Sequence, residues 1–253
     1  MLLCIFGANL LVGICIGLTG IGFMLPMFYL LAVHMTTSEA MAFSFCAFLV
    51  SGMLSTVAFY RKNAVDFRIG TWISVGSVIG TMAGVTVNLL LPPSTVKTIL
   101  YSTVLLSGIS IFLPQKANRD THIGFLGTWS ISHVVICIAI GVVTGCICSA
   151  AGAGGPILVI PILSILGMPI HKVIGTAMYN SIFLSLFAFP RYFLAAGGTE
   201  MVYFAWIPVL LILFGAGVLI GSRYAFRMNQ TKLKRTIAVL CVGIAVWKLI
   251  GHG

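Results

Sequence analysis

The chain has 253 residues, of which 60% are hydrophobic and only 7% are charged, and several apolar runs exceed the roughly 20 residues needed to cross a bilayer. These proportions exclude an ordinary water-soluble domain, and long uninterrupted runs favour helices over a β-barrel. The net charge of +10 does not indicate nucleic-acid binding, because the basic residues lie in short connections between apolar runs, where they orient a membrane protein.

The apolar runs predict an all-α polytopic membrane protein. Eight runs occupy residues 2–33, 39–60, 69–91, 96–113, 124–167, 173–195, 201–222 and 236–250. We interpret the first run as a retained span rather than a signal peptide, because no basic residue precedes it and no cleavage pattern follows. The run 124–167 would be about 66 Å long as one helix, roughly twice the hydrocarbon thickness, so it must break.

The glycine-rich stretch 149–161, SAAGAGGPILVIP, supplies the break. Gly152, Gly154 and Gly155 disfavour a helix, whereas Pro156 suits the first turn of a new one. A helix that restarts inside a membrane presents unpaired N–H groups and the positive end of its dipole, and an anion is their natural partner. The alternative is that the glycines serve close helix packing alone.

A weaker copy of this stretch, TGIGFMLP, lies at residues 19–26 in the first run. A shift of 135 residues matches Gly20 with Gly155 and Pro26 with Pro161. Corresponding interruptions in two halves of a membrane protein indicate the binding site of a transporter.

We therefore predict two homologous repeats of four runs each within one integral membrane domain, residues 1–115 and 116–253, with runs 1 and 5 broken. The distribution of charge indicates how the repeats are oriented. If run 124–167 turns back at its glycines, 11 of the 14 Lys and Arg gather on one face and three on the other. Such an asymmetry is what the positive-inside rule requires, and it inverts the two repeats relative to each other.

The break ending in Pro161, its copy ending in Pro26 and the four-plus-four pattern resemble the sulfite exporter family TauE/SafE, also called toluenesulfonate uptake permeases. The resemblance extends to the helix start Gly175-Thr176-Ala177, and the chain departs from the family pattern at Phe23, a position often held by glycine. It implies an inner-membrane exporter or permease for sulfite, an organosulfonate or a related sulfur-containing anion.

The candidate substrate-binding residues combine the two breaks with the few polar groups inside the runs. They are Thr19, Gly20, Gly22, Ser149, Gly152, Gly154, Gly155, Thr176, Asn180 and Arg191. Hydroxyl and amide groups can bind an oxyanion without holding it too tightly for release. The alternative for each hydroxyl is a bond to its own helix or a neighbour, and for Arg191 a side chain that extends to the interface.

The competing classes are an anion channel, a non-transporting membrane subunit or scaffold, and a membrane-embedded enzyme. The enzyme is the least favoured, because all four carboxylates lie in connections or at run ends and no hydrolase motif is present. No cofactor or metal site is predicted. The identity of the anion, coupling to H⁺ or Na⁺ and self-association are left open by the sequence.

Overall fold

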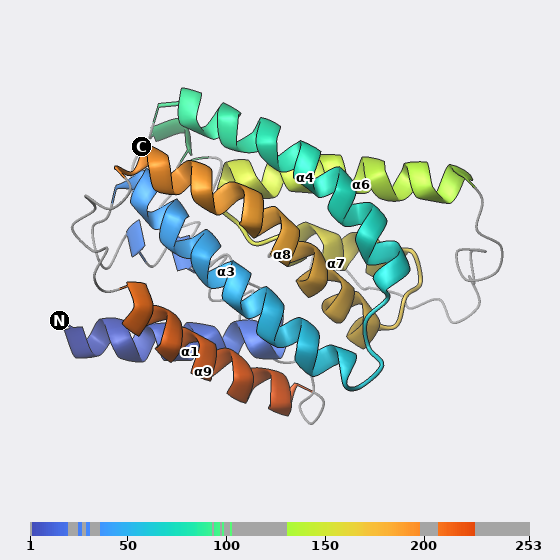
Figure 1. The fold of residues 1–253 in the computed structure, drawn as a ribbon, viewed down its shortest axis with the longest axis horizontal. Helices are drawn as coiled ribbons and strands as arrows, with labels where there is room; N and C mark the ends of the chain where they lie inside the picture. The colour runs from blue at the N-terminus through green and yellow to red at the C-terminus, as the bar shows by residue number, and fades with distance from the viewer. Residues whose placement is uncertain are drawn as a thin grey trace.

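The computed structural model describes residues 2–19, 25–26, 29–30, 36–92, 94–96, 98, 102, 131–197 and 207–225. Long helices make up this part of the chain (Figure 1), and no strand occurs in it. The helices are α1 (Leu2–Thr19), α3 (Thr37–Tyr60), α4 (Phe67–Leu90), α6 (Ile131–Ala151), α7 (Pro156–Ile165), α8 (Ile170–Ala195) and α9 (Ile207–Tyr224). The all-α class is therefore confirmed.

Four of these helices are long and apolar enough to cross a membrane. They are α3, α4, α6 and most of α8, with 21 to 25 residues in each candidate span. The boundaries of α3, α4 and α8 agree with the predicted runs to within three residues, whereas α6 begins at Ile131 and ends at the break inside run 124–167. The predicted runs 96–113 and 236–250 lie almost wholly outside the described residues, so those two predictions stay predictions.

Two of the four acidic residues, Glu39 and Asp66, cap the N-termini of helices. The Thr36 hydroxyl accepts a hydrogen bond from the Glu39 N–H at 3.3 Å, and Glu39 Oε2 accepts one from the Thr36 N–H at 2.9 Å, which forms a capping box before α3. Asp66 accepts a hydrogen bond from the Ile69 N–H at 3.1 Å and so caps α4. These carboxylates therefore serve helix ends that would otherwise leave N–H groups unpaired.

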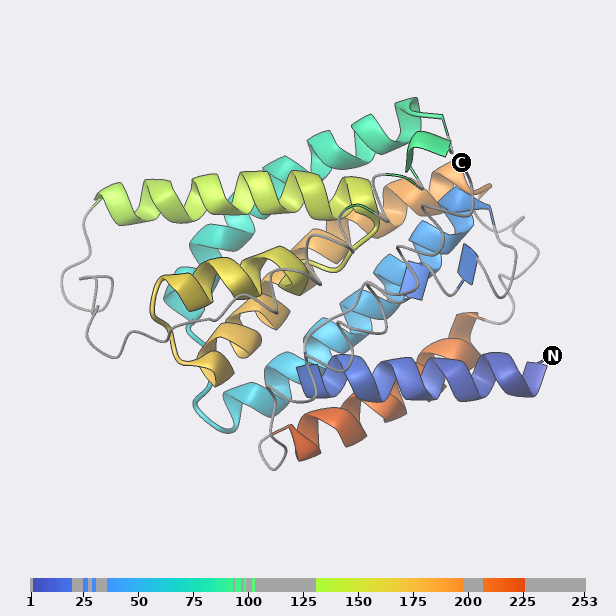
Figure 2. The same cartoon turned by 180° about the vertical axis from the view of Figure 1, so that it is seen from behind.

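The helix α7 runs back beside α6 toward the end of the bundle where α6 begins (Figures 1 and 2). The connection 61–66 between α3 and α4, the connection 166–169 between α7 and α8, and the end of α9 all lie at this same end. We call it the basic end. It carries Arg61, Lys62, Arg68, Lys172 and Arg223, which are all but one of the Lys and Arg residues that the structure describes.

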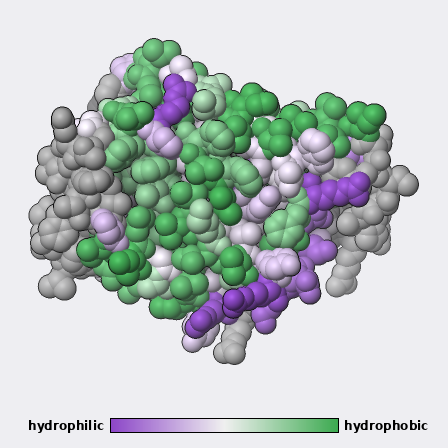
Figure 3. Space-filling model, in the orientation of Figure 1, coloured by the Kyte–Doolittle hydropathy of each residue, from purple (hydrophilic) through white to green (hydrophobic). Residues whose placement is uncertain are grey.

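The surface of the molecule has the pattern expected of a membrane span. Figure 3 shows a broad hydrophobic area over the helices and hydrophilic residues gathered mainly toward the basic end. Large apolar side chains are exposed on the outer faces of the helices, among them Ile79 of α4, Val143 of α6 and Ile212 of α9. In a bilayer these side chains contact lipid.

Glycines let α4 and α6 approach each other at backbone distance. A methyl group at Gly76, Gly80 or Gly84 of α4 would collide with a main-chain carbonyl of α6, and one at Gly141 or Gly145 of α6 would collide with α4. Small residues allow this close packing in membranes, where van der Waals contact drives helix association.

The pair α1 and α9 has the same construction. A methyl group at Gly13 or Gly17 of α1 would strike the backbone of α9, and one at Gly217 or Gly221 of α9 would strike the backbone of α1. The two remaining long helices, α3 and α8, pack against each other in the centre of the bundle. The packing alternative for glycine thus holds for these positions, which lie outside the break.

We expect Gly80→Ala and Gly217→Ala each to destabilise the protein, by about 1–3 kcal/mol, because the added methyl group has no free space between paired backbones. Gly7→Ala is the matched control, since nothing lies within 4 Å of a methyl group there. Thermal unfolding in detergent, followed for the three variants and the wild type, measures the difference. Equal midpoints for Gly80→Ala and Gly7→Ala would contradict the packing that we describe.

Candidate functional site

The predicted break in run 124–167 is confirmed. The helix α6 ends at Ala151, four residues follow, and α7 begins with Pro156 in its first turn. Gly152 has φ +66°, a left-handed conformation that side chains with a Cβ rarely adopt, and Met41 of α3 packs directly against its Cα. Gly152 is therefore required by the geometry of the turn.

The carbonyl groups at the end of α6 are satisfied first by the turn itself. The Ala153 N–H donates to the Cys148 carbonyl at 2.9 Å, and the Gly152 N–H donates to the Ser149 carbonyl at 3.3 Å. This is a glycine C-cap of the kind that ends helices in general.

Side chains from two other helices complete the capping of α6. The Tyr192 hydroxyl of α8 donates to the Ser149 carbonyl at 2.8 Å, and Asn88 Nδ2 of α4 donates to the Ala150 carbonyl at 2.6 Å. Both donor side chains are buried, so they pair with carbonyl groups that water does not reach. Our sequence analysis missed both residues, although Asn88 is an amide inside an apolar run and could have been singled out.

The start of α7 is less fully satisfied than the end of α6. Its N-cap residue, Gly155, offers no side-chain cap, and a side-chain hydrogen bond to its first turn in the described part of the chain joins the Leu158 N–H to the Cys148 thiol. Neither the Gly154 nor the Gly155 N–H donates a hydrogen bond to any residue that the structure describes. Both glycines are buried, so these donors and the positive end of the helix dipole face the interior of the protein.

Asn180 of α8 lies against this helix start. Its side chain is fully buried, and within the described part of the chain neither Nδ2 nor Oδ1 has a hydrogen-bond partner. A methyl group at Gly155 would lie 3.3 Å from Asn180 Nδ2, so the amide and the glycine turn are neighbours. A buried amide without partners costs stability, on the order of 1–3 kcal/mol for each unpaired group. A ligand or a water molecule bound to the amide would remove this cost.

One further unpaired polar group lies on the same helix. Ser185 is fully buried, and its hydroxyl has no partner among the described residues. Leu184 lies one turn after Asn180 on α8. Its Cδ1 atom would be 3.5 Å from a methyl group at Gly155, so Leu184 also packs near the glycine turn. The α8 face that meets the break therefore combines the apolar contact of Leu184 with the amide of Asn180.

Two predicted hydroxyl residues have other partners. Ser149 Oγ donates toward the Cys146 carbonyl at 3.2 Å and the Thr81 carbonyl at 3.4 Å, which ties α6 to itself and to α4. Thr176 Oγ1 accepts a hydrogen bond from the Asp66 N–H at 2.9 Å, which fastens α8 to the connection before α4. The structure thus brings Gly154, Gly155 and Asn180 together, and uses Ser149 and Thr176 to hold helices in place.

Arg191 is bound to α4. Its Nη1 atom donates to Thr86 Oγ1 at 2.8 Å and to the Met82 carbonyl at 3.0 Å. The helix α8 continues through Pro190 to Ala195. The predicted role of Arg191 in substrate binding stays a prediction.

The first break lies largely outside the described residues. Thr19 is the last residue of α1, whereas Gly20 and Gly22 are not described. The predicted end of the first helix agrees with the end of α1, and the predicted binding roles of these three residues stay predictions. No group of three His, Cys, Asp or Glu that could hold a metal ion occurs in the described part of the chain.

Spanning apolar helices, glycine-lined helix pairs and a helix interrupted in the interior define a polytopic helical membrane protein. Residues 4–247 match the family sulfite exporter TauE/SafE, so the chain belongs to this family of membrane transporters. A probable membrane transporter protein of Bacillus subtilis, YunE, is 24% identical over 217 residues, which cover 81% of this chain and 77% of the relative. No solved structure matches the chain.

We expect Gly152→Ala to destabilise the protein by about 2 kcal/mol or more, because alanine is strained at positive φ and its methyl group would overlap Met41. Gly154→Ala is the matched control in the same turn. A methyl group there meets only the Phe48 ring, at 3.5 Å, and the backbone is not left-handed. The measurement is thermal unfolding in detergent. A Gly154→Ala variant as unstable as Gly152→Ala would contradict this account of the turn.

Proposed function

We propose that the protein is a secondary transporter, exporter or permease, for a small oxyanion, with the anion bound at the start of α7 between the two halves. The observation that carries this proposal is the grouping of unpaired, buried donors: the Gly154 and Gly155 N–H groups and the Asn180 amide. An anion at this point would receive hydrogen bonds and the favourable end of a helix dipole. The proposal makes the protein a transporter rather than an enzyme, needing no cofactor.

The chemistry of these donors supports a weakly held anion. Arg191 is engaged by α4, so the donors that the structure groups at the break are uncharged. Neutral donors bind an oxyanion less tightly than a guanidinium does, which favours release on the far side of the membrane. Asn180 Oδ1 also offers an acceptor, which suits an anion that carries a hydrogen, such as hydrogensulfite.

The substrate class that we propose is sulfite, an organosulfonate or a related sulfur-containing anion. The family's name, sulfite exporter, supports it. The relative in Bacillus subtilis is named as a probable membrane transporter, without a substrate. We propose the cell (inner) membrane as the location, and we keep coupling to H⁺ or Na⁺ and assembly into homo-oligomers as parts of the proposal.

We also propose that residues 1–115 and 116–253 are inverted repeats. The exchange of helix partners supports this: α1 of the first half pairs with α9 of the second, and α6 of the second half pairs with α4 of the first. If α1 corresponds to α6 and α4 to α9, these are two copies of one helix pair. The central pair of α3 and α8 then lies on the axis that relates the copies.

The test of the function is flux through proteoliposomes. We expect the protein to move sulfite or an organosulfonate such as methanesulfonate faster than sulfate or acetate, with protein-free liposomes as the baseline. Stoichiometric movement of H⁺ or Na⁺ with the anion would separate a transporter from a channel. Absence of anion flux from a folded, correctly inserted protein, with either imposed gradient, would overturn the proposal.

We expect Asn180→Ala to weaken substrate binding tenfold or more, since a hydrogen bond to a charged ligand contributes roughly 1.5–3 kcal/mol. Asn180→Asp should weaken it further, because the carboxylate repels an anion. Ser51→Ala is the control, since this buried α3 hydroxyl bonds its own helix at the Phe48 carbonyl. Binding is followed as a ligand-dependent rise of the unfolding temperature. An Asn180→Ala variant with wild-type affinity would remove this amide from the proposed site.

For topology, we expect the basic end to face the cytoplasm and the opposite end to face outward. In a cysteine-free background, Lys62→Cys and Pro169→Cys should be protected from an impermeant thiol reagent added outside the cell. Ser94→Cys, just beyond the other end of α4, should react. External labelling at position 169 together with protection at position 94 would show the opposite orientation. Labelling at only one of positions 62 and 169 would contradict their place on the same side of the membrane.

A further inference from the structure

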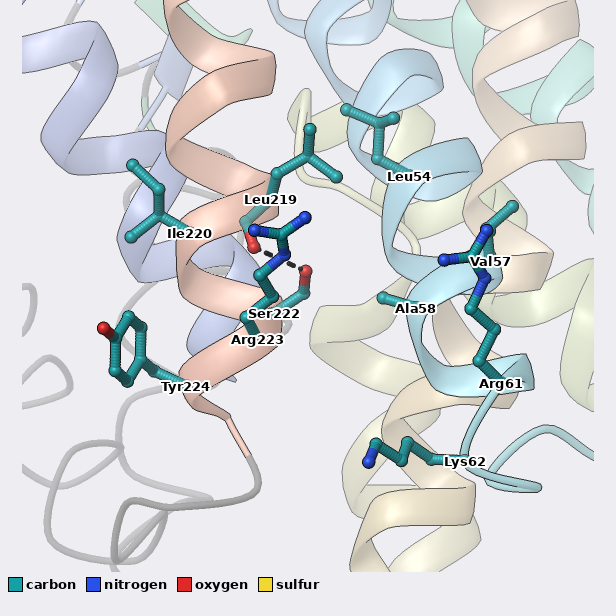
Figure 4. Close-up of a pocket in the computed structure, with 10 residues that line it drawn as sticks. All are labelled: Leu54, Val57, Ala58, Arg61, Lys62, Leu219, Ile220, Ser222, Arg223 and Tyr224. Atoms are coloured by element: carbon teal, nitrogen blue, oxygen red, sulfur yellow. Dashed lines mark hydrogen bonds between the residues drawn. The ribbon is translucent and has the colours of Figure 1, made fainter.

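A groove of about 880 Å³ opens between the last turns of α3 and α9, at the basic end (Figure 4). It lies away from the glycine break, and neither the proposed anion site nor the helix pairs account for it. The residues that line it are Leu54, Val57, Ala58, Arg61, Lys62, Leu219, Ile220, Ser222, Arg223 and Tyr224.

The groove is strongly cationic. Arg61, Lys62 and Arg223 line it from both helices, and Figure 4 shows Lys62 extending from the end of α3 into the space that separates the helices. No acidic residue is among the lining residues, and in the described part of the chain none of the three cations has an ion pair. The acid nearest in sequence, Asp66, is engaged in capping α4. Among the described residues, the charges in the groove therefore lack a counter-ion.

The walls of the groove are also apolar and exposed. Val57 of α3 is 52% exposed, and Leu219 and Ile220 of α9 are 40% and 43% exposed. Ser222 adds no free polar group, because its hydroxyl donates to the Leu219 carbonyl at 3.1 Å (Figure 4). A groove at the edge of the membrane with apolar walls and cations on both sides has the polarity of a phospholipid, with a chain along the walls and a headgroup near the cations.

We propose that this groove binds an anionic phospholipid, with the phosphate between Arg61, Lys62 and Arg223 and an acyl chain along Val57, Leu219 and Ile220. A small free oxyanion would satisfy the charges but leave the apolar walls uncovered. A zwitterionic lipid would cover the walls but bring no net charge to three cations. An anionic phospholipid fits both features, and basic pockets between helices at the cytoplasmic face bind such headgroups. A bound lipid would bridge α3 and α9, and so join the two proposed repeats.

The test is native mass spectrometry of the full chain in detergent, titrated with phosphatidylglycerol or phosphatidylcholine of equal chain length. Each cation near an anionic headgroup contributes about 1 kcal/mol, so we expect Arg223→Gln to lower phosphatidylglycerol affinity about fivefold. Lys172→Gln, a charge at the same end but outside the groove, should leave it unchanged. The triple variant Arg61→Gln, Lys62→Gln, Arg223→Gln should bind both lipids equally.

A second variant tests the apolar wall without changing charge. Val57→Trp fills the groove and should lower phosphatidylglycerol affinity severalfold, with its unfolding temperature in phosphatidylcholine as the check on folding. Millimolar phosphate or sulfite should not displace the lipid from the wild type. Full displacement by either anion would make the groove a free-anion site and overturn the proposal. A triple variant that still prefers phosphatidylglycerol would also overturn the proposal. So would an equal loss of phosphatidylglycerol affinity in Lys172→Gln and Arg223→Gln.

Discussion

Backbone hydrogen bonding inside an apolar medium is the constraint on which this structure depends. A helix that stops within the bundle leaves carbonyl groups at one end and N–H groups at the start of the next helix, with no water to satisfy either. The protein resolves the two ends differently. Asn88 and Tyr192 pair with the carbonyls at the end of α6, whereas the N–H groups of Gly154 and Gly155, beside Asn180, have no partner in the part of the chain that the structure describes. This asymmetry supports the proposal of a negatively charged partner at the break, and it distinguishes the glycines of the turn from those that serve packing.

The glycine contacts also bear on the proposed repeats. If α4 corresponds to α9 and Gly80 to Gly217, a shift of 137 residues, the contacts can be compared. Gly80 meets the backbone at Val142 and Cys146, and Gly217 meets it at Leu10 and Ile14, so the contacting residues of α6 and α1 differ by 132 positions. The sequence shift of 135 matches the prolines after the breaks instead. At 132, Gly20 and Gly22 correspond to Gly152 and Gly154, and Phe23 corresponds to Gly155. A phenylalanine at that position supports unequal roles for the two breaks.

Much of the fold could be predicted because it follows from the length of the apolar runs and the positions of glycine and proline. The break at 152–155 was predictable, since a run of that length cannot cross a bilayer once and its glycines and Pro156 identify where it stops. The hydrogen-bond partners of single polar side chains could not be predicted from the sequence. Ser149, Thr176 and Asn180 look alike in an apolar sequence. Ser149 and Thr176 nevertheless have partners, in α4 and the connection before it, whereas Asn180 has none among the described residues. Arg191 was ambiguous for the same reason, since its acceptors lie more than 100 residues away.

The pairing of α1 with α9 has a consequence for biosynthesis. Gly17 and Gly221 meet across about 200 residues of sequence, and a ribosome adds roughly 5–20 residues per second, so α1 is made some 10–40 s before its partner. During that interval its glycine face has no helix to cover it, whereas α4 and α6 meet much sooner. The pair of α4 and α6 can therefore assemble while the chain is still growing, and the pair of α1 and α9 closes the bundle after the last turns of α9 have left the ribosome.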